Sequence, residues 1–410
     1  MGRKGIVVGG GASGMAAAIM AARQGAEVVI LEHMDRIGKK LLATGNGKCN
    51  LTNLSIRNDC YHCSYPEFPM KVLAHFPVQD TLHFFEELGL MTKNKNGYIY
   101  PNSEQATAVL DLLRLELNRR KVEVVLNCKI HQIEQTAKKI FQIRTNQGDF
   151  SSDFLILATG SKAAPVTGSD GTGYLLAKRF GHRIIPPLPA LVQLRCDGKY
   201  FKQLAGVRCG AKIMLYSCGE FLAEDTGELQ LTDYGISGIP TFQISHFAAK
   251  QLALQKDVRA VLDFMPEKSK KDMHRFLIQR AKKLPDIKCQ DFLTGVLHKK
   301  LAAVLFKLAD IPLGLLAKDV QDNSWRRLTR QIKSLEAVVT ATNSYEQAQV
   351  CCGGVDTHEL MPETLESRLV SGLYLVGELL DVDGICGGYN LQWAWSTGCL
   401  AGIDAGSKCL

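Results

Sequence analysis

GIVVGGGASGMAAAIMAARQGAEVVILE, residues 5–32, is the stretch that decides the fold. An apolar run leads into Gly9-x-Gly11-x-x-Gly14, then an alanine-rich segment, and ends with EVVIL at 27–31. A strand, a glycine turn, a helix and a second strand in this order predict a βαβ unit. Such glycines let the backbone turn tightly and approach a pyrophosphate held at the helix N-terminus. The pattern predicts a dinucleotide site but leaves open which dinucleotide binds.

Later segments favour FAD over NAD. Glu32 closes the second strand, where a carboxylate suits a ribose hydroxyl, and no arginine stands beside it for a 2′-phosphate. FAD is longer than NAD and needs more contacts. Three segments supply them: LILATG at 155–160, GLYLVGELLDVDG at 372–384, and the helix start at 387–392. N–H groups at that helix start suit the negative charge that reduced flavin develops.

Domain boundaries follow from the change of pattern along the chain. The sequence PPLP at 186–189 marks a break, because proline continues neither a helix nor a central strand. The expected fold is α/β, with a Rossmann-like FAD-binding domain at 1–188 and 335–410. Between these parts we expect a β-rich, barrel-like lobe at 189–264 and a basic helical lobe at 265–334. The segment at 38–53 is expected to be a polar, glycine-rich loop around the ligand.

Composition limits the class of protein. The 410 residues are 46% hydrophobic and 22% charged, without an apolar run long enough for a bilayer. Thirteen scattered cysteines and the lack of a signal-like start predict a soluble, cytoplasmic protein. Cys60-x-x-Cys63 is a weak redox or metal pattern without a second half, so no metal is expected. Cys351 and Cys352 fit buried structural thiols.

The net charge of +8 is concentrated in one segment. Residues 256–333 hold eighteen Lys/Arg and nine Asp/Glu, with apolar residues at helical spacing between them. A solvated helix face explains this pattern, and attraction of an anionic substrate or partner is the alternative. The segment lacks interleaved aromatics and any nucleic-acid motif, so neither nucleic acid nor membrane is a predicted partner. Oligomeric state cannot be inferred from the sequence.

Three motifs resemble a known family. ATGNGKCNLTN (43–53), GELQLTDYGISG (227–238) and GLYLVGELLDVDGICGGYNLQWAWSTGCLAG (372–402) are similar to signatures of bacterial FAD-dependent enzymes. Members are catalogued as aminoacetone-oxidase-like or 3-dehydro-bile-acid Δ4,6-reductase-like flavoproteins. The resemblance covers essentially the whole chain. It implies a two-dinucleotide-type FAD domain with β-rich and helical inserted lobes. Cys386 stands where the family more usually has Thr, and Asp233 where His is common.

The resemblance also implies flavin contacts within 38–53 and adenine contact by the backbone near Ile130. Together with the motifs above, it gives a set of expected cofactor-binding residues. The set is Gly9, Gly11, Ala12, Ser13, Gly14, Glu32, Gly38, Lys39, Lys40, Thr44, Gly45, Asn46, Gly47, Asn50, Ile130, Ala158, Thr159, Gly160, Gly377, Glu378, Asp381, Gly388, Asn390, Leu391 and Gln392.

The expected reaction is a flavin-dependent reduction. We expect NAD(P)H to reduce FAD, which passes hydride to an electron-poor C=C bond of a small organic substrate of the steroid kind. Tyr234 is the expected acid or orienting residue. No second GxGxxG marks a separate NAD(P)H domain. Two alternatives stay open. One is an oxidase of a small amine that uses O₂, and the other is an FAD-stabilised RNA- or protein-binding factor.

Overall fold

The computed structural model describes residues 3–408 and forms two compact units. Unit 1 combines residues up to 188 with those from 349 onward, and unit 2 comprises residues 189–348. Within the described range, no helix is both long enough and apolar enough to cross a membrane.

A five-stranded parallel sheet forms the centre of unit 1, in the order β20-β11-β1-β2-β7. Its inner strands are runs of Val, Ile and Leu buried on both faces, as parallel strands require. Parallel strands place their carboxyl ends at one edge, where ligands bind such sheets. The strands are β1 (Lys4–Val8), β2 (Glu27–Leu31), β7 (Glu123–Val125), β11 (Phe154–Leu157) and β20 (Leu373–Leu375).

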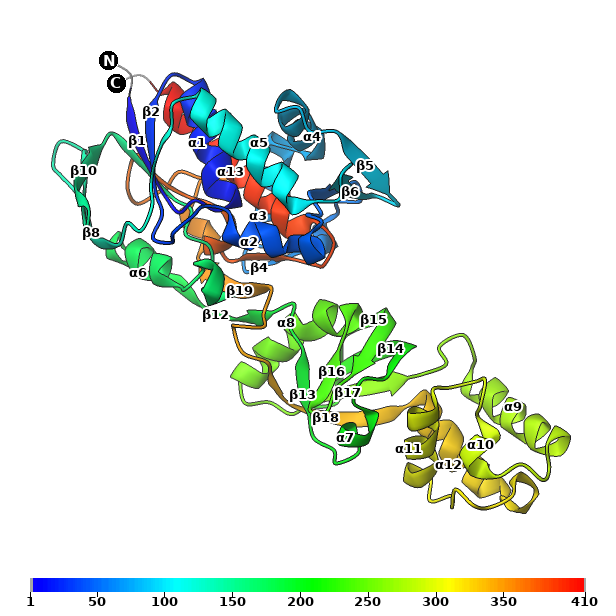
Figure 1. Ribbon diagram of the computed structural model, residues 1–410. Coiled ribbons are helices and arrows are strands. Elements are labelled where there is room, and N and C mark those ends of the chain that lie inside the picture. The colour runs from blue at the N-terminus through cyan, green and yellow to red at the C-terminus, as the bar shows by residue number, and fades with distance from the viewer. Residues whose placement is uncertain (1–2, 409–410) are drawn as a thin grey trace. The chain divides into compact units, whose positions relative to one another are not determined.

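Helices α1 (Ala12–Arg23) and α13 (Tyr389–Ser407) lie side by side (Figure 1). A Cβ at Gly398 would stand 2.3 Å from the carbonyl oxygen of Ser13, and a Cβ at Gly402 would stand 2.3 Å from that of Ala17. The two backbones therefore touch, and only glycine fits at these positions of α13. Both contact positions rise by four along each chain, so the helices run parallel.

Smaller elements complete unit 1. A three-stranded antiparallel sheet joins β8 (Ile130–Gln135), β9 (Phe141–Thr145) and β10 (Gly148–Ser152), and a second joins β3 (Thr52–Asn53), β6 (Tyr98–Pro101) and β5 (Thr92–Lys95). Two-stranded ribbons pair β4 (Tyr61–Cys63) with β21 (Val382–Gly384), and β12 (Ile184–Ala190) with β19 (Val350–Val355). The remaining helices are α2 (Lys39–Ala43), α3 (Phe68–His75), α4 (Val78–Glu87), α5 (Ala106–Arg119), α6 (Thr172–Arg179), η1 (Thr44–Gly47), η2 (Asn58–Cys60), η3 (Pro165–Thr167), η5 (Thr357–Glu359) and η6 (Gly377–Leu379).

Unit 2 is a closed antiparallel barrel with attached helices. The barrel order is β13-β16-β15-β14-β17-β18. Barrel and helices share one hydrophobic cluster, which includes Leu229 from a strand and Trp325 from a helix. The strands are β13 (Leu194–Cys196), β14 (Arg208–Ser217), β15 (Glu220–Leu231), β16 (Gly235–Ser237), β17 (Val258–Asp263) and β18 (Leu335–Thr342). The helices are α7 (Phe201–Leu204), α8 (Ile239–Ala253), α9 (Lys270–Lys283), α10 (Cys289–Phe292), α11 (Lys299–Leu308), η4 (Ala317–Asp319) and α12 (Asp322–Lys333).

The structure corrects four details of the expected organisation. The strand β18 closes the barrel by pairing with β13 and β17, so residues 335–348 belong to unit 2 and not to the FAD-binding domain. The segment at 189–264, expected to be β-rich, also holds the 15-residue helix α8. Residues 39–43 form the short helix α2 within the expected loop. The prolines at 186, 187 and 189 end no strand: they lie inside β12, whose two-stranded ribbon needs few of its N–H groups, although the boundary between the units does fall at 188/189 as predicted.

Candidate cofactor and active site

The glycine turn between β1 and α1 has two positions where only glycine fits and one where a side chain would meet open space. Gly9 has φ of 103°, and a Cβ there would stand 2.5 Å from the carbonyl oxygen of Ala158. A Cβ at Gly14 would lie 2.0 Å from the carbonyl oxygen of Gly9. Gly11, the N-cap of α1, has φ of −81° and open space where its Cβ would be. Gly9 and Gly14 are thus required by the turn itself, whereas the space at Gly11 fits a pyrophosphate at the helix N-terminus.

Glu32 is held at the carboxyl end of β2. The N–H of Gly10 donates to Glu32 Oε2 at 2.8 Å, and the N–H of Met34 donates to Oε1 at 2.8 Å. Each carboxylate oxygen keeps a further lone pair for a ribose hydroxyl. The N–H of Cys128 donates to the Glu32 carbonyl oxygen at 2.9 Å, which brings the backbone before Ile130 to the same strand end.

The N-terminus of α13 lies beyond that of α1 in the same direction. Ser13 is the second residue of α1 but meets Gly398, the tenth residue of α13. Eight extra residues at 1.5 Å each separate the two helix starts by about 12 Å along the axes. Two parallel N-termini, both favourable to negative charge, suit the pyrophosphate and the ring end of one extended flavin dinucleotide.

The helix η6 joins the two helix starts. The Gly377 N–H donates to Thr397 Oγ1 at 3.0 Å, and Trp393 Nε1 donates to the Gly377 carbonyl at 3.1 Å. Gly377 has φ of 69°, and its Cβ would lie 2.5 Å from Ser13 Oγ. Side chains of α1 and α13 therefore hold the backbone at Gly377 between them. Gly377 therefore contacts both helices, and its cofactor contact stays a prediction.

Glu378 ties this segment to two others. Lys40 Nζ lies 2.6 Å from Glu378 Oε2 and 3.3 Å from the carbonyl oxygen of Ala163. The Ser161 hydroxyl donates to Glu378 Oε2 at 3.1 Å. Lys40 and Glu378, both predicted to contact the cofactor, bind each other, and both remain partly exposed. Ser161 was missed by the sequence analysis because a lone serine after a strand carries no recognisable signal.

Asn50 supplies a second test of cofactor fit. Its side-chain oxygen is buried without a hydrogen-bond partner among the described residues. It would lie 2.9 Å from a Cβ at Gly388, the αL residue with φ of 96° that precedes α13. A buried acceptor is costly to leave unpaired. An acceptor at the flavin-ring end of the site fits an isoalloxazine, whose N3–H is a donor. The residues present therefore fit FAD.

Gln392 faces the core at the start of α13. Its side chain is fully buried. It accepts a hydrogen bond from the Thr52 hydroxyl and donates to the hydroxyls of Thr81 and Ser396. Its N–H donates to the Gly388 carbonyl at 2.9 Å. Gln392 therefore braces the start of α13 from within the core, and its cofactor contact stays a prediction.

The other predicted residues lie around this arrangement. Asp381 is 2% exposed and accepts the Ser64 N–H at 3.0 Å. The Asn390 side chain accepts the Gly384 N–H and donates to the Gly384 carbonyl, both at 2.8 Å, and so fixes the strand before α13. The remaining members of the set lie in, or next to the ends of, elements given above: Ala12, Gly38, Lys39, Thr44, Gly45, Asn46, Gly47, Thr159, Gly160 and Leu391.

Tyr234 lies in unit 2, in the turn between β15 and β16. The Arg195 guanidinium stands 5.1 Å from its ring centroid, and its carbonyl accepts the Cys196 N–H at 2.8 Å. The side chain is half-buried. These contacts hold the ring in place, and its role as acid stays a prediction.

The cysteine motif is not arranged for thiol chemistry. Burial raises the pKa of the Cys63 thiol to about 12, and its sulfur lies 3.3 Å from Thr357 Oγ1. A thiol is reactive as the thiolate, so Cys63 is inert at neutral pH. Cys60 is fully buried. Cys386 is half-buried next to Gly387.

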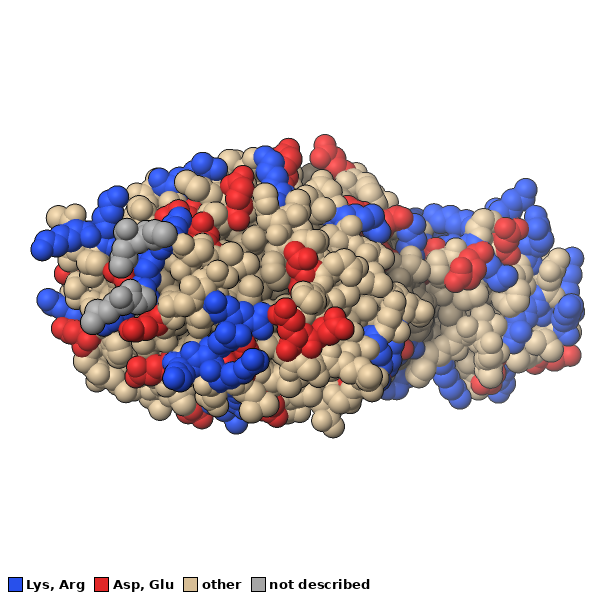
Figure 2. Space-filling view, turned by 90° about the horizontal axis from the view of Figure 1, so that it is seen from above, with Lys and Arg blue, Asp and Glu red and all other residues tan. Residues whose placement is uncertain are grey.

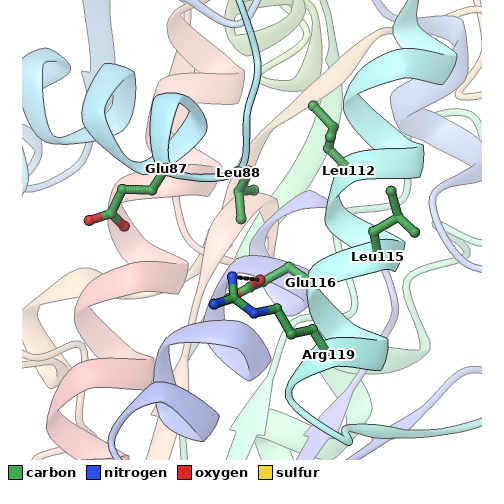
Figure 3. A pocket seen from close by; sticks show the side chains of 6 residues that line it. All are labelled: Glu87, Leu88, Leu112, Leu115, Glu116 and Arg119. Carbon is green, nitrogen blue, oxygen red and sulfur yellow. Dashed lines mark hydrogen bonds and ion pairs between the residues drawn. The ribbon is translucent and has the colours of Figure 1, made fainter.

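Two polar clusters of unit 1 are structural. A hollow of about 170 Å³ is lined by the residues labelled in Figure 3. Its carboxylate Glu116 is 5% exposed and contacts Arg23 at 3.4 Å and Arg120 at 2.9 Å. Although burial alone would raise the pKa of Glu116, these arginines lower it overall. The carboxylate therefore stays ionised and ties α5 to α1.

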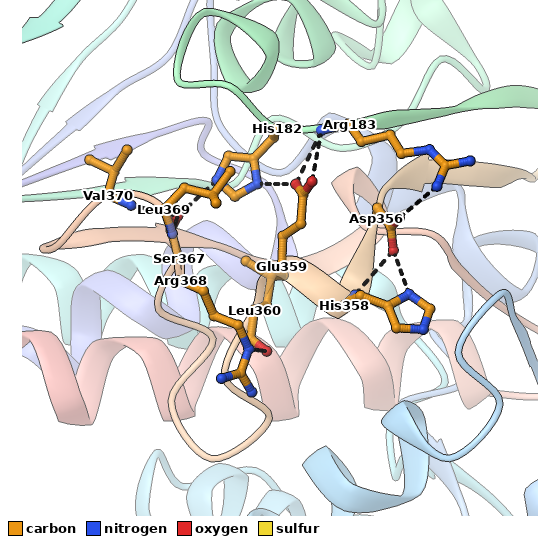
Figure 4. Close-up of polar contacts among 10 residues, drawn as sticks. All are labelled: His182, Arg183, Asp356, His358, Glu359, Leu360, Ser367, Arg368, Leu369 and Val370. Carbon is orange, nitrogen blue, oxygen red and sulfur yellow. Dashed lines mark hydrogen bonds and ion pairs between the residues drawn. The ribbon is translucent and has the colours of Figure 1, made fainter.

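The second cluster is a Ser–His–Glu arrangement (Figure 4). His182 Nδ1 lies 2.7 Å from Glu359 Oε2, and its Nε2 lies 2.9 Å from Ser367 Oγ. The order of groups is that of a hydrolytic triad. However, the histidine side chain is fully buried, and Ser367 Oγ accepts the N–H groups of Leu369 and Val370 at 3.0 Å each. The cluster therefore braces the 356–370 loop.

Comparison with known proteins identifies the family. The sequence-family model described as "HI0933-like protein Rossmann domain" matches residues 3–404 of this chain. A 3-dehydro-bile acid delta(4,6)-reductase of Clostridium scindens is 49% identical over 404 residues, which are 98% of each chain. Ribosomal RNA dihydrouridine synthases of Haemophilus influenzae and Escherichia coli are 30% and 29% identical, over 96% of this chain and 96% and 95% of theirs.

These matches confirm the predicted family and the Rossmann-like FAD-binding fold. They also confirm the prediction of an enzyme, because the reductase is similar along its full length. The match spans both units, so the inserted barrel and helices belong to the family pattern as well. The chain belongs to the HI0933-like family and is an FAD-dependent oxidoreductase.

Proposed function

We propose that this enzyme passes a hydride from NAD(P)H, by way of FAD, to an electron-poor C=C bond of a small, steroid-like substrate. The observation that carries the proposal is the full-length similarity to the 3-dehydro-bile acid delta(4,6)-reductase. The two parallel helix starts of α1 and α13 also support the proposal, because both favour negative charge.

The names of the relatives describe one kind of bond. A 3-dehydro, Δ4,6 steroid has a ketone conjugated with two C=C bonds. Dihydrouridine is uridine with two hydrogens added across a C=C bond next to a carbonyl. In both, the carbonyl makes the far carbon of the double bond electron-poor and open to hydride. The adjacent carbon must then gain a proton.

The chain's own residues have separate tasks in this reaction. FAD, when bound, supplies hydride transfer. The start of α1 at Gly11 and the carboxylate of Glu32 hold its dinucleotide end, and the start of α13 favours negative charge at its ring end. Asn50 offers a buried acceptor at that end. Tyr234 is the proposed proton donor.

Anaerobic stopped-flow absorbance tests the donor and the acceptor separately. NADPH or NADH is expected to bleach the flavin, and a 3-keto-Δ4,6 steroid is expected to restore its colour. Dithionite-reduced enzyme serves as the control, because it tests the acceptor without the nicotinamide donor. Failure of both nucleotides to bleach the flavin rejects the donor, and failure of dithionite-reduced enzyme to react with the steroid rejects the acceptor. Rapid reoxidation by O₂ alone, after reduction by a small amine, would favour the oxidase alternative.

The proposed role of Tyr234 has its own test. The Tyr234→Phe substitution removes only the hydroxyl and keeps the ring under Arg195. A lost proton donor is expected to slow flavin reoxidation by the steroid by about 10²-fold or more. Flavin reduction by the nucleotide should keep its rate. An unchanged reoxidation rate removes Tyr234 from the mechanism.

A second candidate is reduction of a uracil base in RNA. Two relatives are named as ribosomal RNA dihydrouridine synthases, and the helical part of unit 2 is strongly basic. Residues 256–333 carry eighteen Lys/Arg and nine Asp/Glu. Lys and Arg crowd the part of the surface over α9 to α12, at the right of Figure 2. Such a surface attracts a phosphate backbone.

The RNA candidate is tested with unmodified ribosomal RNA and reduced enzyme. Dihydrouridine formation and a steep loss of RNA affinity with salt are its expected results. The variant Lys282→Gln/Lys283→Gln removes two exposed charges of α9 and should weaken RNA binding without changing steroid reduction. Affinity no better than that of an unrelated basic protein rejects this candidate.

A further inference from the structure

The hairpin of β5 and β6 carries lysines and tyrosines on one face. Lys95 pairs across the strands with Tyr98, and Lys93 pairs with Tyr100. Directly opposed residues of an antiparallel pair share a face, and so do residues two apart on one strand. Between the two tyrosines, Ile99 points the other way and is 4% exposed. The apolar side of the hairpin is therefore anchored in the core, and its opposite side presents two lysines and two aromatic rings.

One carboxylate gathers the lysines of this region. Glu104 Oε1 lies 2.6 Å from Lys93 Nζ and also contacts Lys95 Nζ, while Glu104 Oε2 lies 3.1 Å from Lys48 Nζ. Hydrogen bonds from these lysines lower the pKa of Glu104. Glu104 itself has φ of 55°, in the left-handed region that few non-glycine residues adopt. We define the lysine–tyrosine face as Lys48, Lys93, Lys95, Tyr98, Tyr100 and Glu104.

Three lysines around one glutamate leave two positive charges without a carboxylate in the cluster. The side chains of Lys48 and Lys95 remain 52% and 48% exposed, so a ligand can approach both lysines from solvent. A phosphate monoester carries a charge of about −1.5 to −2 at neutral pH. The charge excess of the cluster matches one such group.

The aromatic rings place this charge beside the flavin end of the site. Tyr98 is 41% exposed, and its Cε1 would lie 2.8 Å from a Cβ at Gly387, one residue before the N-cap of α13. Tyr100 Cε1 would lie 3.8 Å from a Cβ at Gly45, in the loop predicted to hold the flavin. The face therefore adjoins both segments that are predicted to approach the ring end of FAD.

We propose that the lysine–tyrosine face binds the phosphate-bearing half of NADPH. The lysines pair with the 2′-phosphate, and Tyr98 offers a flat apolar surface for the base. This inference rests on the proposed function, since it selects NADPH over NADH as the hydride donor. It also accounts for the lack of a second GxGxxG, because a hairpin platform replaces a second Rossmann domain.

Calorimetric titration of the FAD-loaded full chain tests the proposal. The probes are 2′,5′-ADP, which carries the distinguishing phosphate, and 5′-AMP, which lacks it. The unsubstituted protein should bind 2′,5′-ADP about tenfold more tightly than 5′-AMP or better. Lys93→Gln/Lys95→Gln should abolish this difference. Tyr98→Ala should weaken both probes, because it removes the surface for the base.

Lys138→Gln is the matched control, since Lys138 is an exposed lysine in the β8–β9 turn of the same unit. It should bind both probes as the unsubstituted protein does. If the double variant fails to fold, as judged by lost flavin absorbance, the exposed single variant Lys48→Gln replaces it and should lower 2′,5′-ADP affinity alone. Absence of 2′,5′-ADP binding, or binding unaffected by these substitutions, overturns the proposal.

Two further outcomes separate this inference from the proposed function. If 2′,5′-ADP binds as expected but dithionite-reduced enzyme does not reduce the steroid, the face is correct and the proposed acceptor is wrong. If an RNA oligonucleotide loses affinity in Lys93→Gln/Lys95→Gln while 2′,5′-ADP does not, the face belongs to a polynucleotide and the NADPH proposal is overturned.

Discussion

Unit 1 and unit 2 bury their helices in opposite ways. In unit 1, α1 and α13 meet through glycine and alanine, so that a Cβ at Gly402 would stand 2.3 Å from the backbone of α1. In unit 2, helices α11 and α12 fill the core with large side chains such as Leu305 and Trp325. The first contact tolerates no added atom, whereas the second depends on filled volume. The cofactor site requires the first kind, because close backbones set the offset of two helix starts.

Adding atoms to the close contact should have the largest effect. Gly402→Val places three side-chain carbons against the backbone of Ala17. We expect a loss of about 4 kcal/mol in the free energy of unfolding of unit 1, with loss of bound flavin. Chemical unfolding and flavin absorbance measure both. The control is Gly210→Ala in β14, where open space surrounds the new Cβ. A Gly402→Val protein with normal stability would show that α1 and α13 are not held by backbone contact.

Removing atoms from the filled core should have the next largest effect. Leu305 is fully buried in unit 2, and Leu305→Ala should cost about 3 kcal/mol through lost burial and a cavity. Because the residues that fit FAD lie in unit 1, flavin absorbance should persist while unit 2 unfolds at lower denaturant. Loss of flavin together with unit 2 would contradict this separation.

The same contrast explains what the sequence could predict. Gly9, Gly14 and Gly377 are dictated by contacts closer than any Cβ allows, and such glycines are visible as a spaced motif. They led to the βαβ unit, the FAD segments and the start of α13. The strand β18 was assigned to the wrong domain, because an apolar strand carries no mark of the sheet that it joins.

Side-chain roles were harder to predict for a related reason. Gln392 and Asn390 stand two residues apart at the start of α13, yet one points into the core and the other clamps a strand. Periodicity cannot resolve this in the first turn of a helix. Glu104 lies in a turn without a motif, and the lysines that it gathers come from separate segments. Such clusters depend on tertiary contacts that no short pattern encodes.

Gly11 differs from Gly402 in the space around it. A Cβ at Gly11 would meet open space, whereas a Cβ at Gly402 would meet the backbone of Ala17. The Gly11 φ of −81° is also allowed for alanine. We expect Gly11→Ala to change the stability of the FAD-free protein by less than about 0.5 kcal/mol. FAD affinity should fall about tenfold or more, since the methyl group occupies the space for the pyrophosphate. Titration of the apoprotein with FAD measures this, and unchanged affinity would place the pyrophosphate elsewhere.

The smallest effect concerns the buried histidine of Figure 4. Burial lowers the pKa of His182 below 6.5, although Glu359 opposes the shift. As the pH falls below 6.5, the unfolded chain takes up a proton on this residue that the folded chain does not. The folded state is therefore destabilised by acid and regains this stability as the pH rises again.

His182→Gln should unfold more easily at pH 7, since it disturbs the brace, but should lose less stability between pH 7 and pH 5 than the unsubstituted protein does. His75→Gln, at an exposed histidine, should keep the original pH dependence. Equal slopes in all three proteins would show that His182 takes up its proton at the same pH in the folded and unfolded states, which contradicts a lowered pKa.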